Sequence, residues 1–450
     1  MTSIWWIRRD LRLTDNPALQ AALEAGPVIP VFVLDPAFSQ SSPRRKNFLY
    51  EGLHTLDQDL RACKSYLVVR DGRPVEVLRQ LLGETNAKAI YAEEDFTPYA
   101  LTRDEEVARH LPLRLVHGQT VHHPVEVLKA DGKPYRVFTP YAKAWKTRLS
   151  SSLKICPAPE KIKTPVGIPG EALPAFKVSP LFPAGETEAL VRLEEFLHRR
   201  IHAYAEGRDR MDLDGTSSLS PYLHFGMLGL RQAVHAALQA TRQKRGSGAE
   251  TWLNELIWRE FYIQILYHFP DVSRAAYNPS LANIPWRNNE SEFEAWQEGR
   301  TGVPIVDAGM RQLREIGWMH NRARMIVASY LTKDLLIDWR WGEKHFMDEL
   351  LDGDQAANNG GWQWTAGTGT AAAPYFRIFN PVLQSRKFDP SGNYIRSWIP
   401  ELRELDAKRI HAPWEHGLKV KGYPERPIVE RDKERTLLAY RLSKEVVRSK

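Results

Sequence analysis

The chain has 450 residues, a net charge of +7 and 43% hydrophobic residues, and its only cysteines are Cys63 and Cys156. A chain of this length is usually too long to fold around a single hydrophobic core, so two domains are expected. No apolar run could cross a bilayer, the N-terminus lacks a signal-peptide core, and two cysteines cannot build a disulfide framework. These features exclude membrane and disulfide-stapled proteins and favour the cytoplasm.

Residues 1–130 alternate between short apolar runs and helical segments. Strands are predicted at 4–7, 28–34, 66–69, 89–94 and 113–116, with helices between them, for example over 47–62 and 74–82. This alternation predicts a doubly wound parallel sheet, so the segment is expected to be an α/β domain. Because no G-x-G-x-x-G follows the first strand, the usual dinucleotide site is not predicted.

Residues 131–186 are rich in proline and show little periodicity, which predicts a long ordered connector over the surface. From 187 to 450 the pattern predicts an all-α domain, with helical spacing over 188–205, 230–240, 251–267, 306–316 and 321–336. Residues 1–130 contain sixteen Lys and Arg against seventeen Asp and Glu, whereas the remainder contains forty-six against thirty-eight. The basic excess beyond residue 130 favours a partner that bears phosphates, with solubilising charge as the alternative.

The segment 215–226, GTSSLSPYLHFG, places four hydroxyl side chains just before a short apolar helix. Hydroxyls and the free backbone N–H groups of a helix start together form a cradle for an anion. The alternative is an ordinary N-cap, which needs one hydroxyl and not four.

The segment 254–262, NELIWREFY, places Glu255, Trp258 and Arg259 at i, i+3 and i+4, so they share one helix face. An indole can stack on a flipped-out base, a carboxylate can accept its imide N–H, and a guanidinium can bind a phosphate. Taken alone, the motif is more often a buried tryptophan beside an intrahelical ion pair.

The segment 352–364, DGDQAANNGGWQW, combines two acids, paired amides, paired glycines and two tryptophans. Its composition is poor for a helix and poor for a strand. We expect it to let the backbone approach a large planar ligand closely, with polar groups placed at the ligand's edges. The alternative is an ordinary surface loop.

These segments resemble the photolyase/cryptochrome family, most closely its class I enzymes for cyclobutane pyrimidine dimers. The resemblance continues through GWMHNRARM at 317–325, TAAAPYFRIFNPVLQ at 370–384 and IWWIRRDLRLTDNPAL near the start, and it covers nearly the whole chain. It implies an antenna-binding α/β domain over 1–130, a connector over 131–186 and a helical FAD-binding catalytic domain over 187–450.

The resemblance implies that the cofactor is FAD, and no metal site is expected from the cysteine and histidine spacing. The residues assigned to FAD are Tyr204, Thr216, Ser217, Ser218, Leu219, Ser220, Asp352, Gly353, Asp354 and Asn358, with Asn358 facing the central flavin ring. The residues assigned to electron transfer are Trp286, Trp339 and Trp362. From sequence alone each of these tryptophans is more commonly core packing.

The resemblance also implies a lesion pocket and a DNA surface. The catalytic residues are assigned to Glu255, Trp258, Met325 and Asn358, and the DNA contacts to Arg208, Glu255, Trp258, Arg259, Tyr262, Asn321, Arg322 and Gln384. Members that act on (6–4) photoproducts typically have a histidine pair where this chain has His320–Asn321, and plant cryptochromes depart at the pocket methionine and tryptophan and at the asparagine. The residues present therefore favour repair of cyclobutane dimers.

The implied activity is that of a deoxyribodipyrimidine photo-lyase, in which reduced FAD absorbs blue light and passes an electron to the dimer of UV-damaged DNA, and the electron returns after the ring splits. The alternatives are a cryptochrome photoreceptor without repair and a flavin-independent nucleotide-binding α/β protein. Ala100 stands where folate-binding members usually have a glutamate, which puts a folate antenna in doubt and leaves deazaflavin, flavin or no antenna open. We expect a cytoplasmic monomer.

Overall fold

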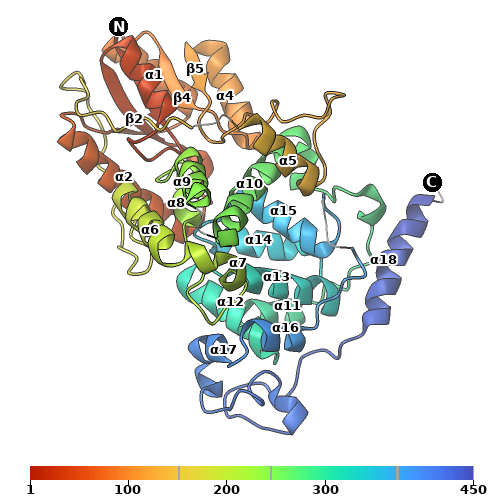
Figure 1. Ribbon diagram of the computed structural model, residues 1–450. Helices are drawn as coiled ribbons and strands as arrows, with labels where there is room; N and C mark the ends of the chain where they lie inside the picture. Colours follow the sequence, from red (N-terminus) through yellow and green to blue (C-terminus); the bar gives the residue numbers. More distant parts are fainter. Residues whose placement is uncertain (150–152, 244–245, 371–373, 449–450) are drawn as a thin grey trace. The chain divides into compact units, whose positions relative to one another are not determined.

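The computed structural model describes residues 1–149, 153–243, 246–370 and 374–448 (Figure 1). The chain forms two compact units. Unit 1 comprises Met1–His202 with Ser217–His268, and unit 2 comprises Ala203–Thr216 with Phe269–Lys450. Within the described ranges, no helix has the length and apolar character needed to span a membrane.

Unit 1 contains the strands and the helices that pack with them. Its strands are β1 (Ser3–Ile7), β2 (Val28–Leu34), β3 (Val68–Asp71), β4 (Ile90–Glu93) and β5 (Leu113–Val116). Its helices are α1 (Pro17–Ala25), α2 (Pro43–Ala62), α3 (Pro74–Thr85), α4 (Pro98–His110), α5 (Phe138–Arg148), α6 (Glu186–Arg199), α8 (Ser220–Phe225), α9 (Leu230–Arg242) and α10 (Gly246–His268).

The strands form one parallel sheet in the order β3-β2-β1-β4-β5, which confirms the predicted doubly wound domain. Ile4 lies opposite both Ile29 and Ile90, so β1 is central and buried on both faces. The strand order reverses at β1, where the chain first adds strands on one side and later on the other. In open sheets this switch point is where ligands usually bind.

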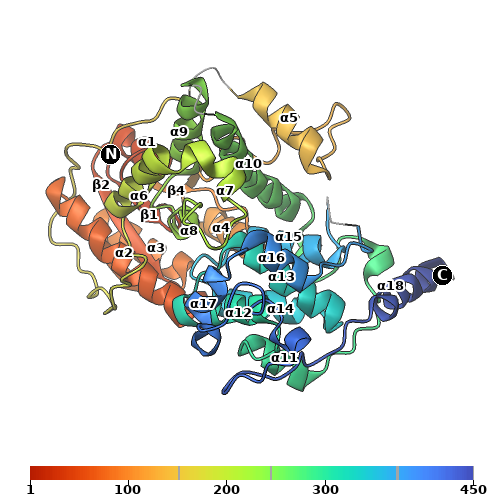
Figure 2. The ribbon, with the colours of Figure 1, turned by 60° about the horizontal axis from the view of Figure 1, so that its bottom comes forward.

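The segment predicted as a connector contains a helix, α5, that the sequence pattern did not reveal. Tyr141, Ala142 and Trp145 form its buried stripe, and Thr139–Pro140 and the flanking lysines mask that periodicity. Figures 1 and 2 both show α5 beside α10, and the two helices are in contact. Residues 153–185, by contrast, contain no helix or strand and bond to the sheet region, for example through the N–H of Val28 to Lys163 O at 2.9 Å.

The boundaries between the two compact units do not coincide with the composition changes at residues 130 and 186. Helices α6 and α8–α10, which were predicted in the helical domain, cluster with the sheet in unit 1. The boundaries at 130 and 186 stay a prediction about the domains of the family. The helix predicted over 188–205 is also shorter than expected, because α6 ends at Arg199 and a 3₁₀ turn, Ile201–Ala203, follows.

Unit 2 is helical in the part that the structure describes, as predicted. Its helices are α7 (Tyr204–Gly207), α11 (Glu290–Gln297), α12 (Pro304–Ile316), α13 (Asn321–Ser329), α14 (Trp339–Glu349), α15 (Gln355–Ala366), α16 (Pro381–Phe388), α17 (Asn393–Trp398) and α18 (Lys433–Arg448). After α13 the chain makes a π-helical turn, Tyr330–Asp334, so the helix predicted to 336 ends early. The core is drawn mainly from α12, α13, α14 and α15, with α17 packed on α12.

Most of the segment predicted to be poor helix material is helix α15, so that expectation was wrong. Asp354 caps the helix by accepting a hydrogen bond from the N–H of Ala357 at 3.1 Å. The amides of Asn359 and Gln363 both donate to Val272 O at 2.9 Å. A good N-cap and these tertiary hydrogen bonds outweigh the low helix propensity of asparagine and glycine.

Candidate functional site

The hydroxyl run before α8 adopts an unusual backbone. Ser218 has φ +52°, a left-handed conformation that is uncommon for a residue with a side chain. Leu219 is buried, whereas the hydroxyl-bearing residues around it are only partly buried. In unit 2, Gly215 packs against Gly207, because a Cβ at Gly215 would lie 2.5 Å from Gly207 O. The run therefore begins at a tight backbone crossing, close to the buried Tyr204 of α7.

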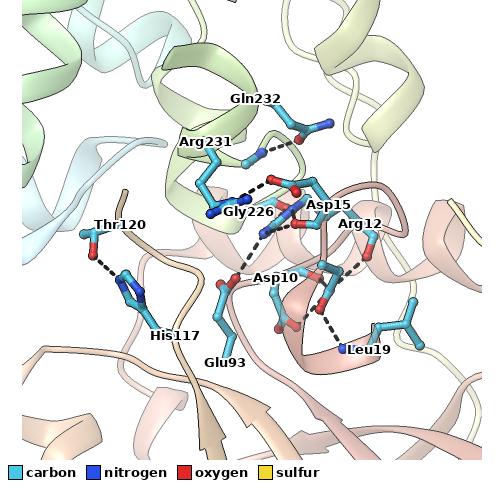
Figure 3. Close-up of polar contacts among 12 residues, drawn as sticks. Asp10, Arg12, Asp15, Leu19, Glu93, His117, Thr120, Gly226, Arg231 and Gln232 are labelled. Atoms are coloured by element: carbon cyan, nitrogen blue, oxygen red, sulfur yellow. Dashed lines mark hydrogen bonds and ion pairs between the residues drawn. The ribbon is translucent and has the colours of Figure 1, made fainter. Parts of the chain in front are cut away.

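A buried ion-pair network in unit 1 fixes the far end of α8 (Figure 3). Arg12 donates to Glu93 Oε1 at 3.0 Å and to the main-chain oxygens of Asp15 and Gly226 at 3.0 and 3.1 Å. Burial raises the pKa of Glu93 to about 7, and the charge of Arg12 opposes that shift. Only glycine fits at Gly226, because φ is +68° and a Cβ would lie 1.8 Å from Arg9 O.

The two acids at the start of α15 are held by different means. Asp352, which is 7% exposed, pairs with the guanidinium of Arg324 at 2.8 and 3.1 Å. Asp354, 4% exposed, caps α15, and Gly353 between them is buried. Arg324 was not predicted as a site residue, although it lies in the segment GWMHNRARM at 317–325. Arg324 also donates to Met319 O at 2.8 Å, so the guanidinium is fixed between two acceptors.

Asn358 lies one turn along α15 and contacts α14. Its amide donates to the main-chain oxygen of Glu343 at 3.0 Å, and the Glu343 carboxylate accepts from Asn359 at 3.0 Å. Burial raises the pKa of Glu343 to about 7. This carboxyl group thus bonds to Asn359, the residue after the asparagine assigned to the flavin ring. The sequence pattern did not single out Glu343.

Helix α10 carries the residues assigned to the lesion pocket on its partly exposed side. Glu255, Trp258, Arg259 and Tyr262 are all partly buried. The guanidinium of Arg259 donates to Leu223 O at 3.4 Å, and burial raises the pKa of Tyr262 above its ordinary value. The Trp258 indole stacks on Phe138, with ring centroids 3.7 Å apart and planes 4° apart. Phe138 was not foreseen from the sequence.

Helix α13 in unit 2 carries the other residues assigned to that pocket. Asn321 Nδ2 lies 3.8 Å from Met325 Sδ one turn further on, so the two side chains are in contact. His320 caps the helix, since its Nδ1 accepts from the N–H of Arg322 at 3.1 Å. Burial lowers the pKa of His320 to about 4, which keeps the ring neutral and able to accept this bond.

The two arginines of unit 2 that are assigned to DNA contacts lie beside one acid, Asp209. Arg322 pairs with Asp209 at 2.7 Å and lies over the Phe388 ring, 4.3 Å from its centroid. Arg208 lies 3.9 Å from the same acid. Gln384 precedes Phe388 by one turn of α16 and is partly exposed. Both side chains are guanidiniums, the group that binds phosphate oxygens through charge-assisted hydrogen bonds.

The three tryptophans assigned to electron transfer lie in or against one core of unit 2. Trp339 and Trp362 are 3% and 2% exposed, whereas Trp286 is partly exposed. The Trp362 ring meets Phe346 edge-on at 5.0 Å, and Trp286 meets Tyr440 edge-on at 6.0 Å. Two buried rings and one partly exposed ring are what an electron path from the interior to the surface would need. Their order along such a path stays a prediction.

Residues 95–104, which include Ala100, follow the carboxyl end of β4 in unit 1, and we expect them to line a second-chromophore site. Ala100 is buried in the first turn of α4, so position 100 offers no carboxylate. Tyr99 is 42% exposed and donates to Asp35, and the Arg103 guanidinium lies over the rings of Trp6 and Tyr99. In the described residues, no group of three histidine, cysteine or acidic side chains could hold a metal ion.

The structure thus brings together several of the predicted sets. Unit 1 holds the α10 residues Glu255, Trp258, Arg259 and Tyr262. Unit 2 holds Asp352, Gly353, Asp354 and Asn358, the α13 residues, the basic pair with Gln384, and the three tryptophans. The hydroxyl run spans the boundary, with Thr216 in unit 2 and Ser217 in unit 1. The role of each residue stays a prediction.

Comparison with known proteins gives two family matches along the chain. The family described as "DNA photolyase" matches residues 3–162, and the "FAD binding domain of DNA photolyase" matches residues 252–444. A relative from Synechococcus sp., named deoxyribodipyrimidine photo-lyase, is 42% identical over 95% of this chain and 93% of its own.

Solved structures agree with these matches. A bacterial class III photolyase from Agrobacterium tumefaciens superposes with a TM-score of 0.93 and 38% identity, covering 99% of this chain and 98% of its own. A cryptochrome from Synechocystis sp. PCC6803 superposes with a TM-score of 0.86 and 30% identity, covering 100% of this chain and 98% of its own. The sequence identity is thus higher to the repair enzyme than to this cryptochrome.

Proposed function

The chain belongs to the DNA photolyase family, and from this membership we propose that it uses light to split cyclobutane pyrimidine dimers in UV-damaged DNA, with FAD as cofactor. The observation that carries the proposal is the packing of α13 against α15 in unit 2. Arg324 of α13 holds Asp352 just before α15, and the same helix α13 carries Asn321 and Met325. One helix thus supports residues assigned to the cofactor and residues assigned to the lesion.

The residues around the start of α15 fit FAD. Two buried carboxylates, a guanidinium and an amide offer acceptors and donors suited to a flavin ring edge and ribose hydroxyls. Gly361 is exposed within α15, and a Cβ placed there would meet no atom within 4 Å, so this part of the helix leaves room for a planar ligand. When bound and reduced, FAD supplies a light-excitable one-electron donor.

The protein's own residues then bind and orient the substrate. Trp258 offers a flat face to a pyrimidine, and Glu255 can accept an imide N–H of the same base. Arg208 and Arg322 carry the charge needed beside phosphates, which should make affinity fall with salt. Base flipping would bring the lesion to these residues, because a base that stays stacked inside the duplex cannot reach them.

A cryptochrome-type photoreceptor without repair activity is the alternative function. Against it stand Met325 and Trp258 at the pocket and Asn358 at the flavin, where plant cryptochromes depart. The photo-lyase from Synechococcus sp. is also more similar in sequence than the Synechocystis cryptochrome.

A second chromophore in unit 1 is part of the proposal, because the sheet has a switch point at the carboxyl ends of β1 and β4. The absence of a carboxylate at position 100 favours a deazaflavin or a second flavin over a folate. We also infer a monomer in the bacterial cytoplasm, where its DNA substrate would lie.

The test of this function measures flavin content and DNA binding of the purified protein. We expect a yellow or blue protein with one FAD per chain. It should bind a duplex with one thymine dimer far more tightly than the same duplex without damage. A colourless protein would contradict the cofactor assignment, and equal affinity for the two duplexes would favour the photoreceptor.

A further inference from the structure

The rings of Phe138, the first residue of α5, and Trp258 of α10 form a parallel stack. The planes lie 4° apart at a centroid distance of 3.7 Å, whereas aromatic pairs more often adopt edge-on or offset arrangements. Phe261 meets both rings edge-on, at 5.9 Å from Phe138 and 5.4 Å from Trp258. Phe138 therefore covers one face of the indole, and Phe261 closes its edge.

The helical positions indicate the side from which Phe138 approaches Trp258, while the ring of Tyr262 lies tilted by 32° with its centroid 5.4 Å from the indole. Side chains on α10 that contact α5 or the chain just before it include Glu250, Asn254, Glu260, Phe261 and Gln264. At 100° per residue these positions form one stripe along the helix. Glu255, Arg259 and Tyr262 form a neighbouring stripe, and Trp258 lies between the two. Phe138 thus stacks on the indole from the side of α5, away from Glu255.

Helix α5 and the chain just before it contact α10 on both sides of Trp258 along the helix. Trp145 Nε1 donates to the buried carboxylate of Glu260 at 2.6 Å. The Lys146 ammonium donates to Glu250 at 2.5 Å and to Asn254 at 2.7 Å. Gln264 Nε2 donates to Tyr135 O at 2.9 Å, just before α5 begins. These contacts hold the first residue of α5, Phe138, at a fixed place on α10.

We propose that Phe138 is a positioning residue for substrate recognition: by parallel stacking it fixes the plane of the Trp258 indole, so that the face turned toward Glu255 is presented to a pyrimidine. The proposal rests on the proposed function, in which Trp258 stacks on a base. A preformed indole plane lowers the ordering cost of binding, since the side chain need not be immobilised by the base. Phe138 itself touches no substrate.

The test compares variants that distinguish the effect of the aromatic ring from the effect of side-chain size. Phe138→Tyr keeps the planar ring, and Phe138→Leu keeps an apolar side chain without one. Phe176→Leu is the matched control, because Phe176 is a partly buried ring in unit 1 that packs on His54 at 4.8 Å, outside α5 and α10. Each FAD-loaded protein is titrated in the dark with a thymine-dimer duplex and with the undamaged duplex.

We expect Phe138→Leu to weaken binding of the dimer duplex about fivefold to tenfold. This loss is only part of the contribution of a base–aromatic stack, because the Trp258 ring itself remains. Binding of the undamaged duplex should be unchanged, because phosphate contacts dominate it. Phe138→Tyr and Phe176→Leu should match wild type on both duplexes. If wild type prefers the dimer duplex and Phe138→Leu binds that duplex as tightly as wild type does, the proposal is overturned. If wild type binds the dimer duplex and the undamaged duplex equally well, the proposed function is overturned instead.

A second readout uses no DNA and no flavin activity. In protein labelled with 5-fluorotryptophan, the ¹⁹F resonance of Trp258, assigned with Trp258→Phe, reports the ring's surroundings and motion. Phe138→Leu should shift this resonance and alter its width while the other tryptophan signals stay in place. In Phe138→Tyr the Trp258 resonance should keep the wild-type position and width. An unshifted Trp258 signal in Phe138→Leu would show that the stack does not hold the indole.

Discussion

Asp354 has two separable roles at the scale of a single residue: it caps α15, and it is assigned to FAD. Asparagine is about as good an N-cap as aspartate, whereas alanine costs about 1 kcal/mol. We therefore expect Asp354→Ala to lower both the melting temperature of the FAD-free protein and its FAD content. Asp354→Asn should keep the melting temperature and still lose FAD. Full flavin retention in Asp354→Asn would show that the carboxylate is not needed for the cofactor.

Glu260 gives a pH prediction at the same scale. Burial raises its pKa from 4.5 to about 7, opposed by hydrogen bonds from Trp145, Val121 and His122. The folded state holds this proton more tightly than the unfolded chain does, so the contribution to the free energy of unfolding is full below pH 4.5 and is lost as the pH rises to about 7. Glu260→Gln should remove that part of the dependence.

Urea unfolding at about pH 5 and about pH 8 measures this difference. The stability of wild type relative to Glu260→Gln should be greater at the lower pH. Glu24→Gln, which changes an exposed acid of α1, should retain the wild-type dependence. Parallel pH curves for wild type and Glu260→Gln would contradict the buried, proton-binding role of Glu260.

The predictable part of the candidate site was the part that lies close together in the sequence. Asp352, Asp354 and Asn358 come from one segment, as do Glu255 and Trp258. Arg324, Glu343 and Phe138 were not foreseen, because their partners lie 28, 16 and 120 positions away and only folding brings them together. The buried network of Arg12 and Glu93 was missed for the same reason, at a separation of 81 residues.

At the scale of elements, the strands were predicted well where they are compact runs of β-branched and aromatic residues, such as Val28–Leu34, whereas β3 begins two residues later than predicted. Helix α15 was misread because propensity was weighed without its cap and without the tertiary partners of Asn359 and Gln363. Helix α5 was missed because its apolar stripe is short and lysines alternate with it along the sequence. In both cases contacts with distant residues decided the local structure.

Two glycines on neighbouring helices should respond oppositely to the same substitution. A Cβ at Gly361 in α15 would meet no atom, whereas a Cβ at Gly342 in α14 would lie 2.1 Å from the Trp362 ring. Gly361→Ala should stabilise the FAD-free protein by about 1 kcal/mol through helix propensity. Gly342→Ala should destabilise it by about 1–3 kcal/mol through overpacking.

Chemical denaturation of the FAD-free proteins measures both effects. If α15 approaches the flavin closely at this point, Gly361→Ala should also weaken FAD binding despite the gain in stability. A stabilised variant with unchanged FAD affinity would show that the ligand does not lie over Gly361.

At the scale of the whole molecule, the basic excess beyond residue 130 should appear as salt-dependent DNA binding. Arg322→Gln should weaken binding of damaged and undamaged duplexes by a similar factor and reduce the salt slope by about 1. Arg409→Gln, which changes an exposed arginine of the same unit, should leave the slope unchanged. A loss confined to damaged DNA would assign Arg322 to the lesion and not to a phosphate.

We expect one flavin-bearing chain to repair a dimer with light. The direct measurement uses the FAD-loaded, chemically reduced protein and a duplex with one defined thymine dimer, under blue light and in the dark, with dimer content read by chromatography. We predict loss of the dimer and recovery of two intact thymines under light, and no change in darkness. A dimer that stays intact under blue light while the protein is reduced and bound to it would contradict the account.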